Sequence, residues 1–422
     1  MSDDTIYALS SGRPPAAIAV VRVSGPAVAR VATRLSGALP SPRRATLRTL
    51  RDDAGQALDR ALVMFFPGPG SATGEDLLEL HLHGGRAVVA AVETALGHMP
   101  GLRRAEPGEF TRRALSNGRI DLAQAEGLAD LLEAETDAQR RNALALSDGV
   151  LSQRADRWMT ALSDAAAMVE AAIDYDGEDE VGQVDMDRTT AIVDRVQADM
   201  QSLLDQPSTE RLRDGLVVVL AGPRNAGKSS LFNALVEREA AIVTSIAGTT
   251  RDALEAQVVR AGVPFRLVDT AGLVEETDDP VERIGIARAR GLIGEADILL
   301  WLGSVTDAPA GAWLIAAKAD LCTGPGMPTS IHQPESVAAL WSRLVEHGSS
   351  MLSAGDDLSL SQRQRDIVSH VLPLLASASA EADILIKADH LRVARKALGA
   401  LTGRDATLAL LDALFGRFCL GK

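Results

Sequence analysis

The chain has 422 residues, a formal net charge of −14 and a hydrophobic content of 46%, of which aromatic residues supply little. This length predicts two to four domains, with cores built on Leu, Val, Ile and Ala. The acidic balance argues against broad nonspecific binding to nucleic acid or to an anionic membrane.

The two cysteines, Cys322 and Cys419, form no disulfide framework and suit a reducing compartment. The acidic start, residues 1–4, precedes no long apolar run, so we expect no signal peptide. No apolar stretch is long enough to span a bilayer. We therefore expect a cytoplasmic protein with no membrane partner.

Short apolar runs over 17–23, 61–66 and 77–83 predict strands, and helical patterns lie between them. We expect an α+β domain over residues 1–117. His81 and His83 share one face of the third strand. A metal pair is one interpretation, but no third ligand is evident, and partly buried strand histidines are preferred. Residues 118–213 then predict long helices over 121–147, 151–173 and 187–204.

Residues 222–229 read GPRNAGKS and fit the P-loop pattern GxxxxGK[ST], between an apolar strand and a helix. The loop amides and the helix N-terminus would direct partial positive charge at a phosphate. Lys228 would reach the β and γ phosphates, and the Ser229 hydroxyl would bind Mg²⁺. A chance glycine-rich loop is the alternative. The candidate GTP contacts here are Asn225, Ala226, Gly227, Lys228, Ser229 and Ser230.

Two later segments are typical of a GTPase. Residues 241–252 resemble a switch I segment, in which Thr250 would bind Mg²⁺ when the γ-phosphate is present. A strand over 264–268 delivers Asp269, which would hold the Mg²⁺ shell through water, and Gly272, whose amide would sense the γ-phosphate. The further candidate contacts are Thr244, Ser245, Ile246, Ala247, Gly248, Thr249, Thr270 and Ala271.

Base recognition departs from the usual [NT]KxD pattern. Lys318 and Asp320 are present, but Ala317 replaces the asparagine. Asp320 should keep guanine preference, while the missing amide costs up to roughly tenfold in affinity. The usual Ser-Ala pair of the last base loop is not evident around 330–333. In addition, only residues 303–311 join two expected parallel strands at 296–302 and 312–316, which is too short for a covering helix.

The chain from 358 is helical again and ends in Cys-Leu-Gly-Lys. The chain resembles the MnmE (TrmE) family in five segments. They are this Cys-Leu-Gly-Lys end, residues 4–6, SATGEDLLEL at 71–80, PGEFT at 107–111 and NGRIDL at 117–122. The resemblance implies a multidomain fold: an N-terminal α+β folate-binding-like domain (1–117), a discontinuous α-helical bundle (118–213 and 346–422) and an inserted α/β P-loop GTPase domain (214–345).

Members of this family are tRNA uridine-modification GTPases. The resemblance implies that, with an FAD-dependent partner of the MnmG (GidA) type, the chain attaches a carboxymethylaminomethyl-type group to C5 of the wobble uridine in certain tRNAs. It implies a homodimer through the N-terminal domain and a heterotetramer with the partner. The implied cofactors are GTP, Mg²⁺, K⁺ and 5,10-methylenetetrahydrofolate, or 5-formyltetrahydrofolate as a ligand.

The resemblance also assigns residues that the sequence alone does not. The folate contacts would be Arg22, Glu79, Arg119 and Lys422; without the resemblance the first three would be surface residues. Leu273 replaces the water-orienting glutamine of Ras-like GTPases, and Glu282 takes over that role, although from sequence alone it reads as a solvated helix residue. Potassium would replace the arginine finger, with ligands Asn225, Thr244, Ile246 and Thr249. Cys419 is either catalytic or a buried inert thiol.

Two alternatives remain at this point. A stand-alone regulatory GTPase of the ribosome-assembly type explains Asn225 and Asp269 equally well, but not the N-terminal domain or the Cys-Leu-Gly-Lys end. A nucleotide-binding module with impaired turnover is suggested by Ala317.

Overall fold

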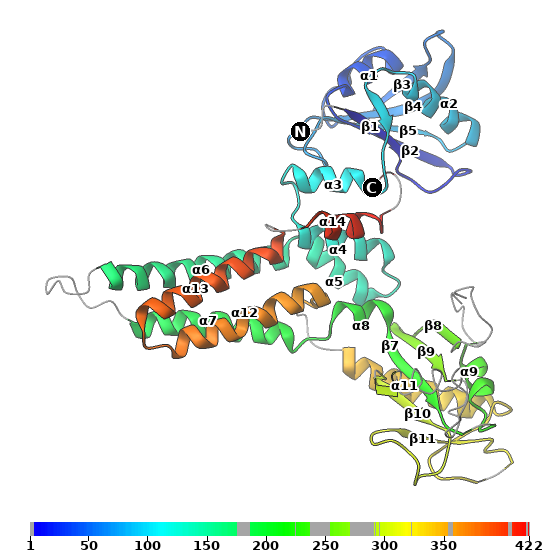
Figure 1. Cartoon of the computed structure of the whole chain (residues 1–422). Coiled ribbons are helices and arrows are strands. Elements are labelled where there is room, and N and C mark those ends of the chain that lie inside the picture. Colours follow the sequence, from blue (N-terminus) through cyan, green and yellow to red (C-terminus); the bar gives the residue numbers. More distant parts are fainter. Residues whose placement is uncertain are drawn as a thin grey trace, which may run out of the picture. The chain divides into compact units, whose positions relative to one another are not determined.

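The computed structural model describes residues 4–174, 186–223, 225–236, 254–270, 291, 293–294, 296–321, 323–352, 358–403, 407–418 and 421. The chain divides into two compact units, each formed by several segments (Figure 1). The first holds Met1–Ala129, Leu146–Met159 and Lys396–Lys422, and the second holds Asp130–Ala145 and Thr160–Arg395.

The first unit is built on a six-stranded sheet with the order β3-β4-β5-β2-β1-β6. All neighbouring pairs are antiparallel except β1 with β6. Its elements are β1 (Thr5–Leu9), β2 (Ile18–Ser24), α1 (Val28–Ser36), β3 (Thr46–Arg51), β4 (Ala57–Phe66), β5 (Leu77–His83), α2 (Arg86–Gly97) and β6 (Leu102–Arg104).

The two faces of this sheet are covered unequally. Alternate strand residues such as Tyr7, Val21 and Leu80 pack against α1 and α2 in the main core. On the other face, Ile6 and Leu77 pack with Phe110 of α3 (Glu109–Ser116) in a smaller cluster. The rest of that second face carries Arg22, Glu79 and exposed apolar side chains, so one half of it lies open.

Helical segments from both ends of the chain complete the first unit. Besides α3 these are α4 (Leu122–Glu133), the 3₁₀ turn η1 (Ala400–Thr402) and α14 (Leu408–Phe415). Leu122 and Ala125 of α4 pack against Phe415 and Phe418 near the C-terminal end. The terminal segment is therefore part of the folded N-terminal unit.

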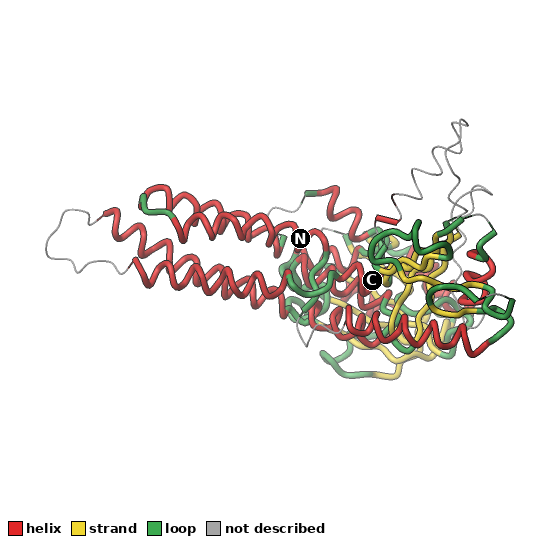
Figure 2. The backbone as a smooth tube through the Cα atoms, turned by 90° about the horizontal axis from the view of Figure 1, so that it is seen from below, coloured by secondary structure: helices red, strands yellow, loops and turns green. Residues whose placement is uncertain are grey.

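Long helices make up one part of the second unit, and Figures 1 and 2 show them lying alongside one another. α7 and α12 pack together although the nucleotide domain separates them in sequence. This pairing confirms a discontinuous bundle with an inserted domain. The helices are α5 (Asp137–Ser147), α6 (Val150–Asp174), α7 (Met186–Leu204), α12 (Gln362–Ala380) and α13 (Ile384–Gly399), of which α5, α6 and α13 also reach into the first unit.

The helix expected over 121–147 is two helices, α4 and α5, so this prediction was wrong. The break lies at 134–136, where the side-chain oxygen of Gln139 accepts hydrogen bonds from the amides of Glu135 and Thr136. A side chain that satisfies the first free amides of a helix stabilises a start at that point. Helical periodicity in the sequence continues through the break and does not reveal it.

The two passages of the chain between the bundle and the inserted domain are joined by hydrogen bonds. α8 (Thr209–Asp214) lies where the chain enters the inserted domain. The Thr209 amide donates at 2.9 Å to the carbonyl oxygen of Leu360, which lies where the chain returns to the bundle. The Thr209 hydroxyl donates to the Ser359 carbonyl oxygen, also at 2.9 Å. Asn142 of α5 accepts from the Ser359 amide at 2.8 Å. Entry and exit therefore lie at one point.

The inserted domain contains a second six-stranded sheet with the order β12-β11-β10-β7-β9-β8, parallel except for β8. One face packs against α9 and α11 through side chains such as Phe232 and Trp341. The expected domain boundary at 345 falls inside α11, whose residues to Leu352 pack on this core. The elements are β7 (Leu216–Ala221), α9 (Lys228–Val236), β8 (Leu254–Arg260), β9 (Val263–Asp269), β10 (Ile298–Trp301), β11 (Trp313–Ala317), β12 (Met327–Thr329) and α11 (Pro334–Leu352).

The short crossover expected from the sequence is confirmed. β10 and β11 are parallel neighbours, and the fully described segment 302–312 between them contains no helix. On this face of the sheet, Leu299 and Trp301 pack with partly buried Ala308 and Ala312 of the crossover and with Ile293, which precedes β10. The crossover itself contributes only a loop with small side chains, where a parallel crossover usually contributes a helix.

None of the helices in the described part of the chain is both long enough and apolar enough to cross a bilayer.

Candidate functional site

The P-loop lies between β7 and α9. Gly227 has a φ of 100° and Asn225 a φ of 61°, both in the left-handed region, which turns the backbone sharply before the helix. The exposed side chains of Asn225 and Ser229 stand at the surface of this turn. Free amides at a helix N-terminus preceded by such a turn form an anion site suited to phosphate.

Lys228 is the charged residue at the centre of this loop. Its ammonium group donates to the carbonyl oxygens of Gly222 at 3.0 Å and Pro223 at 2.9 Å, and the residue is buried. Burial lowers its pKa, while the negative charge of Asp269 acts in the opposite direction. A phosphate that replaced these carbonyl oxygens would give the partly desolvated Lys228 ammonium group a negatively charged partner.

Asp269 ends β9 and lies next to Leu220 of β7 in the parallel register. The residue is buried, and its Oδ1 atom has no hydrogen-bond partner among the described residues. A buried carboxylate oxygen without a donor is costly unless a cation or a bound water satisfies it. Together with the Ser229 hydroxyl of the P-loop, this carboxylate gives a donor set that fits Mg²⁺, which prefers oxygen ligands.

The base-recognition segment follows β11 and contacts the P-loop. Lys318 has a φ of 59°, and its ammonium group donates to the Asn225 carbonyl oxygen at 3.1 Å. Ala317 cannot donate a side-chain hydrogen bond to the P-loop as an asparagine there could, but the neighbouring Lys318 does. The segments expected to hold phosphate and base therefore remain connected.

Asp320 is held by a residue that sequence reasoning missed. The Ser330 hydroxyl donates to Asp320 Oδ1, and its oxygen accepts from the His332 amide at 3.2 Å. The hydrogen bond from Ser330 lowers the pKa of the Asp320 carboxyl group. Ser330 is buried directly after β12, a three-residue strand with little sequence signal. We therefore propose that the last base loop begins at Ser330, with Ile331 in place of the usual alanine.

Several predicted site residues lie outside the described residues. Among them are the whole switch I segment, the water-orienting candidate and two C-terminal candidates, so the structure neither groups nor separates them. They are Thr244, Ser245, Ile246, Ala247, Gly248, Thr249, Thr250, Ala271, Gly272, Leu273, Glu282, Cys419 and Lys422.

A second polar site occupies the open face of the first sheet. Arg22 on β2 and Glu79 on β5 are directly opposed, and Arg22 Nε donates to Glu79 Oε1 at 2.9 Å. His81 Nε2 lies 3.1 Å from the other carboxylate oxygen. His83 instead contacts Asp59 at 2.7 Å. Because the histidines contact different carboxylates, they do not converge as a metal pair, and the described residues contain no cluster of three or more metal-ligating side chains.

Arg119 is fixed by the loop over 71–75. Its Nε donates to the Ser71 carbonyl oxygen at 3.1 Å, and Asn117 donates to the Thr73 carbonyl oxygen at 2.7 Å. The loop is attached to β2 through its last residue, Glu75, whose carboxylate accepts a hydrogen bond from the Ser24 hydroxyl at 2.9 Å. Ser24 lies two residues after Arg22 on the same strand face, so the supports of the two arginines are linked.

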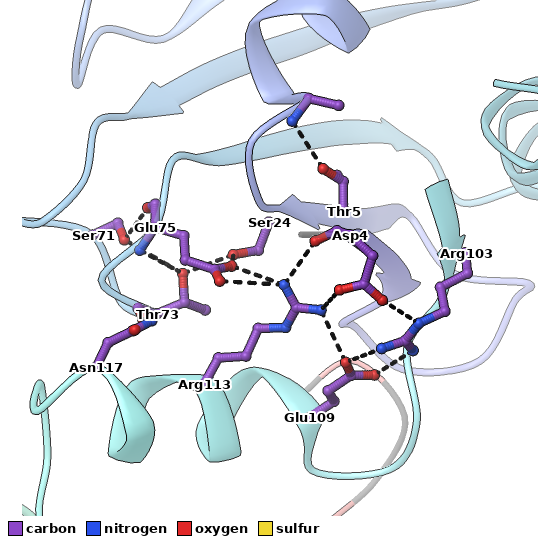
Figure 3. A network of polar contacts seen from close by, with 11 residues as sticks. Asp4, Thr5, Ser24, Ser71, Thr73, Glu75, Arg103, Glu109, Arg113 and Asn117 are labelled. Atoms are coloured by element: carbon purple, nitrogen blue, oxygen red, sulfur yellow. Dashed lines mark hydrogen bonds and ion pairs between the residues drawn. The ribbon is translucent and has the colours of Figure 1, made fainter. Parts of the chain in front are cut away.

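A buried ionic network anchors this loop (Figure 3). Arg113 of α3 points into the centre and donates to Asp4, Glu75 and Glu109 at distances of 2.8 to 3.3 Å. Arg103 of β6 donates to both oxygens of Glu109. Burying several charges is tolerated here because each carboxylate has a guanidinium partner. The sequence motifs that carry the family resemblance supply most of these residues.

The C-terminal end reaches the same sheet. Ser10, directly after β1, donates its hydroxyl proton to the Gly421 carbonyl oxygen at 2.7 Å. β1 is the neighbour of β2, which carries Arg22. The residue before Lys422 is therefore tied to the end of β1, next to the strand that carries Arg22.

Comparisons with known proteins match nearly the whole chain. The family described as the GTP-binding protein TrmE N-terminus matches residues 5–119, and the MnmE helical domain matches residues 122–419. The tRNA modification GTPase MnmE of Novosphingobium aromaticivorans is 53% identical over 436 residues, covering 99% of this chain and all of that protein.

Two further proteins of the same description are similar along their whole length. That of Erythrobacter litoralis is 50% identical, covering 99% of this chain and 100% of its own. That of Rhizorhabdus wittichii is 51% identical, covering 100% of this chain and 97% of its own. Identity at this level over complete chains, with both family matches, leaves one conclusion. The chain belongs to the MnmE family of tRNA modification GTPases.

Proposed function

We propose that this chain binds and hydrolyses GTP and uses the hydrolysis in modification of C5 of the wobble uridine of certain tRNAs. The observation that carries the proposal is the convergence of three segments at the carboxyl ends of parallel strands: the P-loop after β7, Asp269 ending β9 and the base segment after β11. This edge is where open parallel sheets bind nucleotides. Relatives named tRNA modification GTPases share nearly the whole chain.

Each segment has its own task in the proposal. Lys228 and the amides over 225–230 hold the phosphates, and Asp320, steadied by Ser330, accepts from the guanine ring. Ser229 and Thr250 bind Mg²⁺, Asp269 holds the Mg²⁺ shell through water, and Asn225 with Thr244, Ile246 and Thr249 holds K⁺. Bound there, these cations neutralise charge that develops on the phosphates. Glu282 orients the attacking water.

The second site is proposed to bind a one-carbon tetrahydrofolate. Arg119 and Lys422 supply positive charge for its glutamate tail, Glu79 accepts from the pterin ring, and Arg22, which is bonded to Glu79, lies at the pterin end. The arrangement of Arg22 beside Glu79 on an open sheet face supports this assignment. Folate supplies the bridging carbon, and Cys419 is a candidate assistant in that chemistry.

The same open face supports a homodimer through residues 1–117. Ile18, Leu47 and Leu62 point to this face and are 61%, 49% and 43% exposed. Neighbouring exposed apolar side chains on a sheet face are typical of an interface. We further propose a heterotetramer with an FAD-dependent partner of the MnmG type, which supplies basic surface for tRNA, and a cytoplasmic location.

The test is a tRNA nucleoside profile from cells that lack the chain, complemented with the wild type or with Lys228→Ala. We expect the C5-aminomethyl uridine family to disappear and to return with the wild type only. An unchanged profile would contradict the proposal and favour a stand-alone regulatory GTPase. A profile restored by Lys228→Ala would separate the modification from nucleotide hydrolysis.

A further inference from the structure

The carboxylate of Glu79 has a different protein partner on each oxygen. Arg22 Nε donates to Oε1 at 2.9 Å, and His81 Nε2 lies 3.1 Å from Oε2. Because a carboxylate only accepts, the histidine nitrogen is the donor. Two donors on separate oxygens fix both the position and the plane of the carboxylate group.

The strand register explains why these groups meet. Glu79 on β5 is opposite Arg22 on β2 and Met64 on β4, while His81, two residues along β5, is on the same face. The side chains of Glu79 and His81 are 13% and 26% exposed. The pair is therefore partly shielded from water but still open to a ligand, which strengthens a hydrogen bond without closing the site.

We propose that His81 is a positioning residue for pterin recognition, an inference that rests on the proposed folate site. The amino-pyrimidinone edge of a pterin presents two neighbouring N–H donors to a carboxylate. Each carboxylate oxygen accepts two hydrogen bonds, so one protein donor per oxygen leaves one acceptor position on each. His81 and Arg22 hold Glu79 in the orientation that such a bidentate contact requires, and the ligand does not have to order it on binding.

The adjacent histidine provides a matched control. His83 shares the strand and the face, but its ring contacts Asp59 at 2.7 Å and its side chain is 73% exposed. Removing His83 changes the same residue type two positions away without touching Glu79. A difference between the two histidine variants then reports the contact with Glu79 rather than the loss of an aromatic ring from β5.

The experiment measures the Kd of 5-formyltetrahydrofolate for the full chain by isothermal titration calorimetry. We expect His81→Leu to weaken binding by about tenfold, since a hydrogen bond to a charged group is lost. His81→Gln, which keeps an N–H donor, should stay within about threefold of the wild type. His83→Leu should leave the Kd unchanged, and Glu79→Gln should abolish measurable binding.

The outcomes separate the two levels of inference. No binding by the wild type overturns the proposed folate site. Binding by the wild type with an equal Kd for His81→Leu overturns the role of His81 and leaves the folate site in place. Equal losses for His81→Leu and His81→Gln, with lowered Tm values for both, also overturn it, because a structural effect would not be rescued by a donor.

Discussion

The hydroxyl group of Ser330 donates to the carboxylate of Asp320, so the residue expected to read guanine is held by the loop that follows β12. The hydrogen bond keeps Asp320 in one rotamer and lowers the pKa of its carboxyl group, which favours the charged form. We therefore expect base affinity in this domain to depend on a serine as well as on the aspartate.

Substituting Ser330→Ala should weaken GTP and GDP binding by about three- to tenfold, because one hydrogen bond to a charged group is lost and Asp320 gains rotamer freedom. Titration with a fluorescent guanine nucleotide measures the change. Ser342→Ala is the control, since its hydroxyl donates to the Ala338 carbonyl oxygen of its own helix. Equal affinities for wild type and Ser330→Ala would contradict this role.

Substituting Asp320→Asn should exchange GTP preference for XTP preference. An aspartate accepts from the two donors on the guanine edge, whereas an asparagine amide can donate to the extra carbonyl of xanthine. Mismatched polar pairs are disfavoured strongly, on the order of 10²-fold or more. Competition of GTP, ATP and XTP against a labelled nucleotide measures it. If the wild type binds ATP as well as GTP, Asp320 does not read guanine.

The network around Arg113 should make the N-terminal unit sensitive to acid. Burial alone would raise the pKa of Glu109, but hydrogen bonds from Arg103, the Glu106 amide and Arg113 outweigh it, and the pKa is lowered. The stabilisation is present above the ordinary glutamate pKa of about 4.3 and is lost as pH falls through the lower folded-state value.

Glu109→Gln should therefore cost about 1–3 kcal/mol at pH 7 and much less near pH 3. Calorimetric Tm values at both pH values measure the difference. Asp53→Asn, which breaks an exposed ion pair with Arg34, should change Tm little at either pH. A Glu109→Gln effect that is the same at pH 7 and pH 3 would refute the assignment.

The helix-free crossover should leave β11 less protected than β9. Both strands are second from an edge of their sheet. The crossover that leads into β11 is a loop whose small side chains pack on one face of the sheet. Local opening is easier where fewer apolar contacts must break, and we expect about tenfold faster amide exchange in β11. Hydrogen exchange read by mass spectrometry compares the two strands directly. Equal protection would show that the loop covers the sheet as well as a helix does.

Placing a charge on the open sheet face should dissociate the proposed dimer. Leu62→Lys puts an ammonium group on this face between Leu47 of β3 and His81 of β5. The variant should be monomeric by analytical ultracentrifugation at concentrations where the wild type is dimeric. Val305→Lys changes a similarly exposed apolar residue in the nucleotide domain and should remain dimeric. A dimeric Leu62→Lys variant would place the interface elsewhere.

Local patterns predicted the fold well where one segment carries its own signal. The strand at 264–268, the P-loop between β7 and α9, and the helix-free crossover all follow from short runs of sequence. The partners of Arg113 could not be found this way, because Asp4 and Glu75 lie 109 and 38 residues away in the chain. Ser330 was missed for a similar reason: its role depends on tertiary contact with Asp320, not on a motif.

The hydrogen bonds between Thr209 and residues 359–360 have a consequence for how such a chain can arise. Because the inserted nucleotide domain leaves the helical bundle at the point where it enters, α7 and α12 pack together without any contribution from it. Excising residues between these two points and joining them with a few flexible residues leaves the partners of α7 and α12 in place. The architecture thus permits gain or loss of a whole nucleotide switch in one genetic event, with no redesign of the scaffold that carries it.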